Sequence, residues 1–249
     1  MRKTFKFMAM GAAMAFAACG KDDDNETGSD TGGGNTGGGT GTETAEWVDL
    51  GLPSGLLWAK CNLGASSPEE YGDYYAWGET TANEVYDWNT YKYSNGHYTR
   101  LTKYCYSSDY GYNGFTDNLT TLEAMDDAAT QKLGSGARMP TKAEWEELIN
   151  NTTAEWTTLN GVNGRKLTAS NGKSLFLPAA GHRWDVEPSS AGSIGCYWSS
   201  SLYAGSPHNA WYFYFYLGGI YKNKKDNQSV LIHDRDRGIS VRAVRASQN

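Results

Sequence analysis

Six consecutive aromatic residues, at positions 211–216, constrain the fold of this chain more than any other segment. Side chains alternate between the two sides of a β-strand, so a strand over this run carries two different aromatic faces. One face holds Trp211, Phe213 and Phe215, and the other holds Tyr212, Tyr214 and Tyr216. Because a buried tyrosine hydroxyl needs a hydrogen-bond partner, we expect the first set to be buried and the tyrosines to meet a ligand. The alternative is a sheet that is buried on both faces.

The distribution of aromatic and charged residues predicts a single folded domain at 46–249. All nine tryptophans and all six prolines lie there. The chain has 249 residues, with 22 Lys and Arg against 28 Asp and Glu, which gives a net charge of −6. This balance argues against a nucleic-acid partner, because binding to phosphates requires a dense cationic face. A mean hydropathy of −0.61 excludes a protein with many membrane spans.

The first 18 residues have the pattern of a secretory signal peptide. Arg2, Lys3 and Lys6 precede a short apolar run, which the small residues of Ala17-Ala18-Cys19 close. This closing segment resembles the lipobox of bacterial lipoproteins, and the resemblance implies lipidation of Cys19. A plain secreted protein is the alternative.

Residues 19–45 follow as a lipidated tether that is rich in Gly, Thr and Asp. Because they contain no aromatic residue, they cannot bury a core and are expected to be flexible. The run Lys21-Asp22-Asp23-Asp24 resembles the signal that directs Bacteroidota lipoproteins to the outer face of the outer membrane. The sequence therefore predicts an outer-membrane lipoprotein exposed at the cell surface, with a solvated charge run as the alternative interpretation.

Capping boxes predict two helices in the domain. In such a box, a Thr side chain and a Glu three residues later each bond the other's backbone at the helix start. Thr120 pairs in this way with Glu123, and Thr141 pairs with Glu144. A shorter helical turn is expected over Pro68–Gly72, which begins with proline and ends with glycine.

Short strands are expected over most of the remaining domain. Turn residues separate the apolar runs 47–50 and 56–59, and Asn171-Gly172 separates 166–169 from 174–177 as in a β-hairpin. The further expected strands are 196–200, 210–217 and 239–244. Two helices followed by many short strands predict an α+β domain with short antiparallel sheets.

Six runs of this domain resemble, in the same order, the Fibrobacter succinogenes major paralogous domain. They are Asp49–Gly55, Cys61–Ala65, Tyr71–Glu79, Arg138–Thr141, Leu177–Gly181 and Tyr197–Ser201. That family is similar to C-type-lectin-like domains and, more distantly, to formylglycine-generating enzymes. The resemblance implies a C-type-lectin-like fold with paired terminal strands, two helices and a long loop region. It implies no general catalytic activity and no cofactor.

An enzyme is the rival function, because residues 138–145 also resemble the helix-entry motif of the formylglycine-generating enzymes. The oxidase chemistry of that family needs paired cysteine thiolates that hold copper. Apart from Cys19, the chain has Cys61, Cys105 and Cys196, which are widely spaced and allow at most one disulfide. We therefore interpret 138–145 as a capped helix start, and an enzyme of unknown chemistry stays as the alternative.

The sequence predicts no metal site. Glu187-Pro188-Ser189 resembles the Glu-Pro-Asn tripeptide of calcium-binding lectins, but a serine replaces the residue with the amide ligand. The four histidines, at 97, 182, 208 and 233, lack the spacing of metal ligands. A loop turn is therefore the preferred interpretation of 187–189.

The C-terminal part of the domain, about 197–245, is the predicted ligand-binding region, because polar and aromatic residues typical of binding loops surround the aromatic strand. The candidate ligand-binding residues are Tyr203, Ser206, His208, Asn209, Tyr212, Tyr214, Tyr216, Tyr221, Asn223, Asn227, His233, Asp234, Arg235 and Asp236. Their frame, Trp198–Leu202, Ala210-Trp211 and Gly238–Val244, resembles the variable region of C-type-lectin-fold proteins that retroelements diversify. The expected partner is an unknown protein or glycan at the cell surface, bound non-covalently. A structural or adhesin-like surface component is the other alternative.

Overall fold

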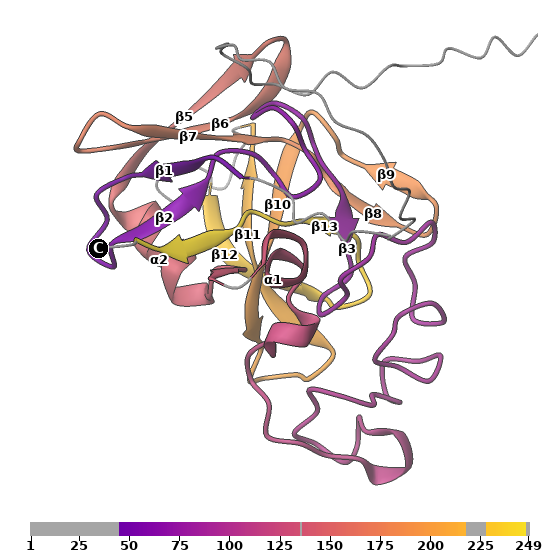
Figure 1. The fold of residues 1–249 in the computed structure, drawn as a ribbon. Helices are drawn as coiled ribbons and strands as arrows, with labels where there is room; N and C mark the ends of the chain where they lie inside the picture. The colour runs from indigo at the N-terminus through magenta and orange to yellow at the C-terminus, as the bar shows by residue number, and fades with distance from the viewer. Residues whose placement is uncertain (1–44, 135, 218–227, 248–249) are drawn as a thin grey trace, which may run out of the picture. The chain divides into compact units, whose positions relative to one another are not determined.

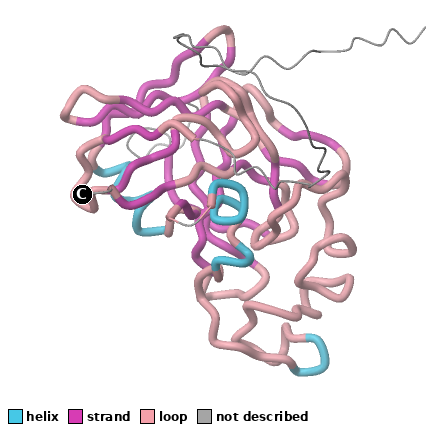
Figure 2. Tube along the Cα trace, viewed as in Figure 1, coloured by secondary structure: helices cyan, strands magenta, loops and turns pink. Residues whose placement is uncertain are grey.

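The computed structural model describes residues 45–134, 136–217 and 228–247, which all belong to one compact unit. Strands and loops dominate this unit, and two α-helices accompany them (Figures 1 and 2). The expectation of an α+β domain is therefore confirmed. No helix within these described ranges is long and apolar enough to cross a lipid bilayer.

The first sheet joins strands from the two ends of the domain, in the order β1-β2-β14-β4. It contains β1 (Trp47–Asp49), β2 (Leu56–Ala59), β4 (Ala137–Arg138) and β14 (Val244–Ala246), all paired antiparallel. In the turn between β1 and β2, Gly55 has a φ of 69°, a conformation that favours glycine. The predicted strand, turn and strand at 47–59 are thus confirmed, with β1 ending one residue early.

The central sheet has five strands in the order β12-β11-β10-β13-β3. They are β3 (Tyr74–Tyr75), β10 (Ile194–Leu202), β11 (Asn209–Tyr216), β12 (Gln228–Asp234) and β13 (Ile239–Ser240). The strands expected at 196–200 and 210–217 are confirmed as β10 and β11. The single strand expected at 239–244 is wrong, because the chain leaves the central sheet after Ser240 and enters the first sheet at Val244.

A third sheet and a separate hairpin complete the strands. β5 (Thr152–Leu159), β6 (Val162–Ala169) and β7 (Ser174–Pro178) pair antiparallel in chain order. The predicted hairpin at Asn171-Gly172 is confirmed, since Thr168 pairs with Ser174 across this turn. β8 (His182–Trp184) pairs with β9 (Glu187–Ser189), so the tripeptide at 187–189 is a hairpin strand.

The two helices are α1 (Ala128–Leu133) and α2 (Lys142–Asn150), and a 3₁₀ turn, η2 (Ala124–Asp126), precedes α1. The capping box of α2 is confirmed: the Thr141 amide donates to the Glu144 carboxylate at 2.7 Å, and the Glu144 amide donates to Thr141 Oγ1 at 3.3 Å.

The helix start expected at Thr120 is wrong, and Asp127 caps α1 instead. The backbone at Thr120 accepts from the Leu202 amide at 2.9 Å, so this segment pairs with the end of β10. The helical turn expected over Pro68–Gly72 is also absent from the described elements. There the Glu70 carboxylate accepts from the Ser66 amide at 2.7 Å and closes a tight turn.

Two hydrophobic clusters lie on opposite faces of the central sheet. The first cluster includes Trp77, Tyr104, Trp198, Tyr212 and Ile239. The second cluster includes Trp145, Leu148, Tyr197, Phe213 and Phe215, so it lies beneath α2 and the third sheet. Both faces of β10 and β11 are therefore used in packing.

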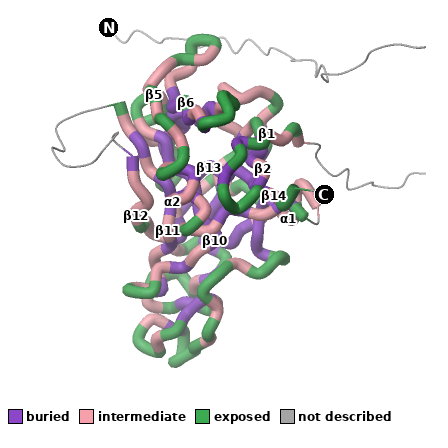
Figure 3. Tube along the Cα trace, turned by 90° about the vertical axis from the view of Figure 1, so that its left-hand side faces the viewer, coloured by how far each residue is buried: buried purple, intermediate pink, exposed green. Residues whose placement is uncertain are grey.

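Residues 76–123, which we call the long loop, connect β3 to η2. They contain one 3₁₀ turn, η1 (Tyr112–Gly114). Much of this loop is exposed, as Figure 3 shows at its lower end. Its buried side chains are nevertheless numerous: Trp77, Glu79, Tyr86, Tyr91, Tyr93, Leu101, Tyr104 and Cys105. The long loop therefore has its own small interior.

Candidate functional site

β11 carries the two aromatic faces that its alternation predicts. Phe213 and Phe215 are fully buried, and Phe213 stacks on Trp145 of α2 with ring centroids 4.9 Å apart. Trp211, expected on the same buried face, is only half-buried, and the Lys142 ammonium lies 4.8 Å from its ring centroid. This face is therefore closed along most of the strand but open at its N-terminal end.

The tyrosine face of β11 is divided. Tyr212 is buried between the rings of Trp198 and His233, at centroid distances of 6.2 and 5.4 Å. Tyr214 and Tyr216 are half-buried, and their ring centroids are 5.8 Å apart. The expectation that all three tyrosines meet a ligand is wrong for Tyr212, because it belongs to the first hydrophobic cluster.

Arg235, a predicted ligand-binding residue, is fully buried and anchors the long loop. Its guanidinium donates to the carbonyls of Lys103 and Tyr104, both at 3.0 Å, and to the carbonyl of Pro207 at 2.7 Å. It also donates to the Tyr91 hydroxyl at 2.9 Å and lies over the Trp77 ring at 5.0 Å. Because buried carbonyls need partners, this side chain holds the long loop against the β10–β11 turn. Its assignment as a ligand contact is a correction.

A carboxylate provides a second anchor for the long loop. Asp126 of η2 accepts hydrogen bonds from the Lys103 ammonium at 2.6 Å, from the Tyr104 hydroxyl at 2.7 Å and from the Tyr93 hydroxyl. Burial opposes ionisation of Asp126, but these donors hold its pKa below the ordinary value. The loop is thus fixed at both Arg235 and Asp126.

Asp236 is also buried, which corrects its assignment as a ligand contact. Its Oδ2 accepts from Arg237 at 3.2 Å, whereas its Oδ1 has no hydrogen-bond partner among the described atoms. Burial raises the pKa of Asp236 to about 7, and the nearby Arg237 opposes this shift only in part.

Asp234 and Asn209 lie at the accessible end of the β11–β12 pair. Both are half-buried, and the Asn209 amide donates to Asp234 Oδ1 at 2.8 Å.

His233 lies at the edge of the tyrosine face. Its ring centroid is 5.5 Å from that of His182 on β8. Burial lowers the pKa of His233 to about 4, and the neighbouring imidazole of His182 and the charge of Arg237 act in the same direction. Burial also lowers the pKa of His182. Both imidazoles are therefore expected to be neutral at neutral pH.

The β10–β11 turn brings His208 against aromatic side chains of the long loop. The His208 ring lies 5.0 Å from Tyr98, 5.3 Å from Tyr110 and 6.4 Å from Trp88, measured between centroids. We call these four residues the His208 cluster. Tyr98 is 39% exposed, and the other three are half-buried, so the cluster reaches the surface.

Polar groups surround the His208 cluster. Ser206 Oγ lies 2.8 Å from His208 Nδ1, and burial lowers the pKa of His208 while Asp234 opposes this change. Tyr203, also half-buried, packs edge-on against Trp211 at 5.2 Å. Of the predicted residues, the turn therefore gathers Tyr203, Ser206, His208 and Asn209 at one surface.

The contribution of Trp88, Tyr98 and Tyr110 to this surface is missing from the sequence-based prediction. One signal for it was present, since eight of the 17 tyrosines lie between residues 86 and 112. Such a density is unusual for a loop, where polar residues normally dominate. Four other predicted positions, Cys19, Tyr221, Asn223 and Asn227, lie outside the described residues.

The cysteines of the domain carry no disulfide: Cys61, Cys105 and Cys196 are free thiols. Burial raises the pKa of each of them, which disfavours the thiolate that nucleophilic or copper chemistry requires. Within the described ranges, no group of three or more His, Cys, Asp or Glu side chains is arranged to hold a metal ion.

Comparison of the chain with protein-family models, with curated proteins and with solved structures gives no significant match.

Proposed function

We propose that this protein is a cell-surface binding protein whose domain has a C-type-lectin-like fold and contacts its ligand non-covalently. Support for the fold comes from the pairing of β2 with β14, from the two helices and from the long loop between β3 and η2. These are the features that the resemblance in sequence implies.

The observation that carries the proposed function is the His208 cluster. Two segments more than 90 residues apart, the long loop and the β10–β11 turn, present partly exposed aromatic rings side by side. Aromatic side chains provide large contact area at low cost in conformational entropy, and nearby hydroxyl and amide groups provide hydrogen bonds. Arg235 and Asp126 hold the loop in place, so this surface is organised before a ligand arrives.

The chemistry of the surface favours recognition over catalysis. His208 lies against the Ser206 hydroxyl, but burial keeps its pKa low and three aromatic rings surround it. Such an imidazole is well suited to stack and to form one hydrogen bond. The expected partner is a protein or a glycan that offers flat apolar surface together with hydroxyl or amide groups.

The test is a binding screen of the full chain against a printed glycan array and a displayed random peptide library. We expect ligands whose affinity falls at least about tenfold in a Tyr98→Ser variant and in a His208→Ala variant. Trp184→Ser is the matched control, because Trp184 is a more exposed aromatic residue, at 61%, on a different hairpin. Ligands that depend on Trp184 and ignore both cluster variants would overturn the proposal.

Anchoring at the outer membrane is the second part of the proposal, and it depends on Cys19. A Cys19→Ser variant is expected to move from the membrane fraction to the soluble fraction. Replacing Lys21, Asp22 and Asp23 by alanine is expected to leave the protein in the membrane but hide it from external protease. Unchanged partitioning of Cys19→Ser would contradict the lipoprotein proposal.

Diversification by a retroelement is the third part. If it operates, the half-buried positions Tyr203, Ser206, His208 and Asn209 are expected to vary among copies, whereas the buried Arg235 stays constant. Sequencing of the neighbouring DNA tests this, since a reverse transcriptase and a near-copy of the last part of the coding region are required. Their absence would contradict diversification and leave ligand binding itself unaffected.

A further inference from the structure

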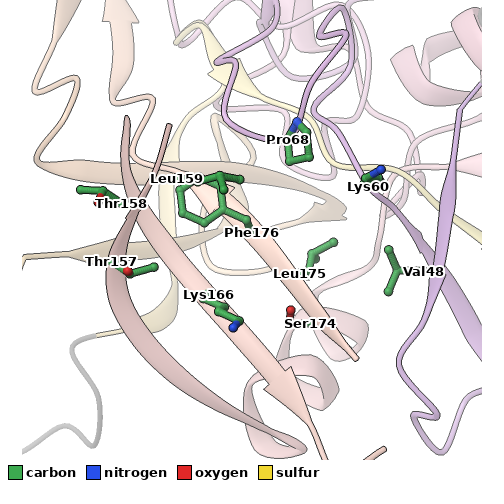
Figure 4. A pocket seen from close by; sticks show the side chains of 10 residues that line it. All are labelled: Val48, Lys60, Pro68, Thr157, Thr158, Leu159, Lys166, Ser174, Leu175 and Phe176. Carbon is green, nitrogen blue, oxygen red and sulfur yellow. The ribbon is translucent and has the colours of Figure 1, made fainter. Parts of the chain in front are cut away.

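A groove separate from the His208 cluster lies between the first sheet and the third sheet. It encloses about 440 Å³, which is within the range of small-molecule sites. Figure 4 shows its lining side chains, which come from β1, from the segment Lys60–Pro68 and from strands β5, β6 and β7. Its apolar lining consists of Val48, Pro68, Leu159, Leu175 and Phe176.

The wall formed by β7 owes its shape to a glycine. The Phe176 ring lies directly against Gly164 on the neighbouring strand, because a Cβ at Gly164 would be 2.5 Å from Phe176 Cζ. Any larger residue at 164 would push the ring into the groove.

A buried arginine holds the two walls of the groove together. Arg242 is fully buried, and it donates to the Lys60 carbonyl at 2.8 Å on one wall and to the Phe176 carbonyl at 3.1 Å on the other. Two further bonds, at 3.0 and 2.6 Å, go to Asn62 Oδ1. The separation of the walls is therefore set by one side chain with fixed geometry, so the groove exists without a ligand.

The charge of the lining differs from that of the whole chain. Lys60 and Lys166 both line the groove, and the lining residues include no carboxylate, although the net charge of the chain is −6. The nearest carboxylate on the β5 side is that of Glu155, the cross-strand partner of Lys166. Lys60 bonds Glu46 at 2.6 Å, but both side chains are exposed, and such surface ion pairs contribute little free energy. Thr157 and Ser174, on the same face of the third sheet as Lys166, add hydroxyl donors.

From the apolar walls, the two ammonium groups and the hydroxyl donors, we infer that the groove binds a small carboxylate with an unbranched apolar chain. The chain would pack on Val48, Leu159 and Phe176, and the carboxylate would accept from Lys60 or Lys166. This site is independent of the His208 cluster, so either can fail without the other.

The test uses isothermal titration of the full chain with decanoate below its micelle concentration. We expect saturable binding at one site, and at least about tenfold weaker binding of decanol and of decylamine, which lack the negative charge. Equal affinity for the three probes, or no binding of decanoate at millimolar concentration, would overturn the inference.

Variants locate the site. The double variant Lys60→Gln, Lys166→Gln is expected to weaken decanoate binding at least about tenfold. The control is Lys173→Gln, which should leave decanoate binding unchanged, because Lys173 lies at the tip of the β6–β7 hairpin and outside the lining.

Thr157→Trp is expected to fill the groove and abolish decanoate binding without changing the unfolding midpoint. Thr153→Trp, on the same face of β5 but outside the lining, is its control. Decanoate binding that survives both groove variants would contradict the site.

Discussion

The two faces of β11 are closed by different means. On the phenylalanine face, α2 and the third sheet supply regular elements, and Phe213 stacks on Trp145. On the tyrosine face, cover comes from Trp198, His233 and the first hydrophobic cluster, to which the irregular long loop contributes. Alternation along a strand therefore predicts which side chains share a face, but the depth of burial depends on what the rest of the chain places over that face.

The largest effect is expected on the phenylalanine face. Phe213→Ala removes a fully buried ring and leaves a cavity beneath α2, so we expect it to cost on the order of 3 to 5 kcal/mol of unfolding free energy. Tyr214→Ala, next along the strand but half-buried, is expected to cost much less. Urea unfolding of both variants measures the difference. Equal losses would show that the two faces are equally part of the core.

The cover of the tyrosine face is tested by Arg235→Met. This change leaves the carbonyls of Lys103, Tyr104 and Pro207 without their donor, and we expect a loss of about 3 kcal/mol. Limited proteolysis should then cut within the long loop, at 76–123, before the sheets unfold. Arg100→Met is the control, since Arg100 is an exposed arginine of the same loop. Cleavage spread evenly over the domain would contradict a local anchoring role.

A smaller effect is expected from pH at the edge of the tyrosine face. The pKa of His233 is about 4 in the folded protein, against an ordinary value of 6.5. Well above pH 6.5, His233 is neutral in both the folded and the unfolded protein, so it contributes no pH dependence to the unfolding free energy. As the pH falls from 6.5 towards 4, the unfolded state takes up the proton first, so we expect His233 to lower the unfolding free energy by about 2.5 kcal/mol at pH 4.5.

The His233→Phe variant isolates that contribution. It keeps a ring against Tyr212 but has no titratable group, so its unfolding free energy should fall less between pH 7.5 and pH 4.5 than that of the wild type. Asp236 has a raised pKa, which favours the folded state in acid. Because Asp236 is present in both proteins, its contribution to the pH dependence of stability cancels in the comparison. Identical pH slopes would show that His233 is solvated.

The smallest effect is expected at the start of α2, which covers the phenylalanine face. Thr141→Ala removes the side chain that accepts from the Glu144 amide, and we expect a cost of about 1 kcal/mol. Thr141→Ser keeps the hydroxyl and should be nearly neutral. Thermal unfolding of the two variants provides the comparison. A loss as large as that of Phe213→Ala would mean that Thr141 does more than cap the helix.

Sequence patterns predicted the elements whose signals are local. The Asn171-Gly172 turn fixes its hairpin, and Thr141 with Glu144 fixes the start of α2, because each signal acts within a few residues. The same type of signal failed at Thr120, where a backbone bond to Leu202 competes with helix formation. The strand at β12 was also not predicted, since its pairing with β11 depends on a segment outside its own sequence.

The candidate site was predicted in part for a related reason. Tyr203, Ser206, His208 and Asn209 lie in one turn, so their common location follows from sequence order. Arg235 has the same polar character, but its burial results from carbonyls of the long loop that lie about 130 residues earlier in the chain. The aromatic residues of that loop could not be placed beside His208 for the same reason.

The hydrogen bonds of Arg242 also determine when this protein can finish folding. They join it to Ala59, Lys60 and Asn62, about 180 residues earlier, and β14 then enters the first sheet between β2 and β4. Closing such a long segment is slow, because the chain loses much conformational entropy before the contacts between its distant ends form and stabilise the fold. During synthesis, β1 and β2 therefore remain unpaired with β14 until that strand emerges. Until then, the edge of β2 that β14 later covers is open to wrong partners.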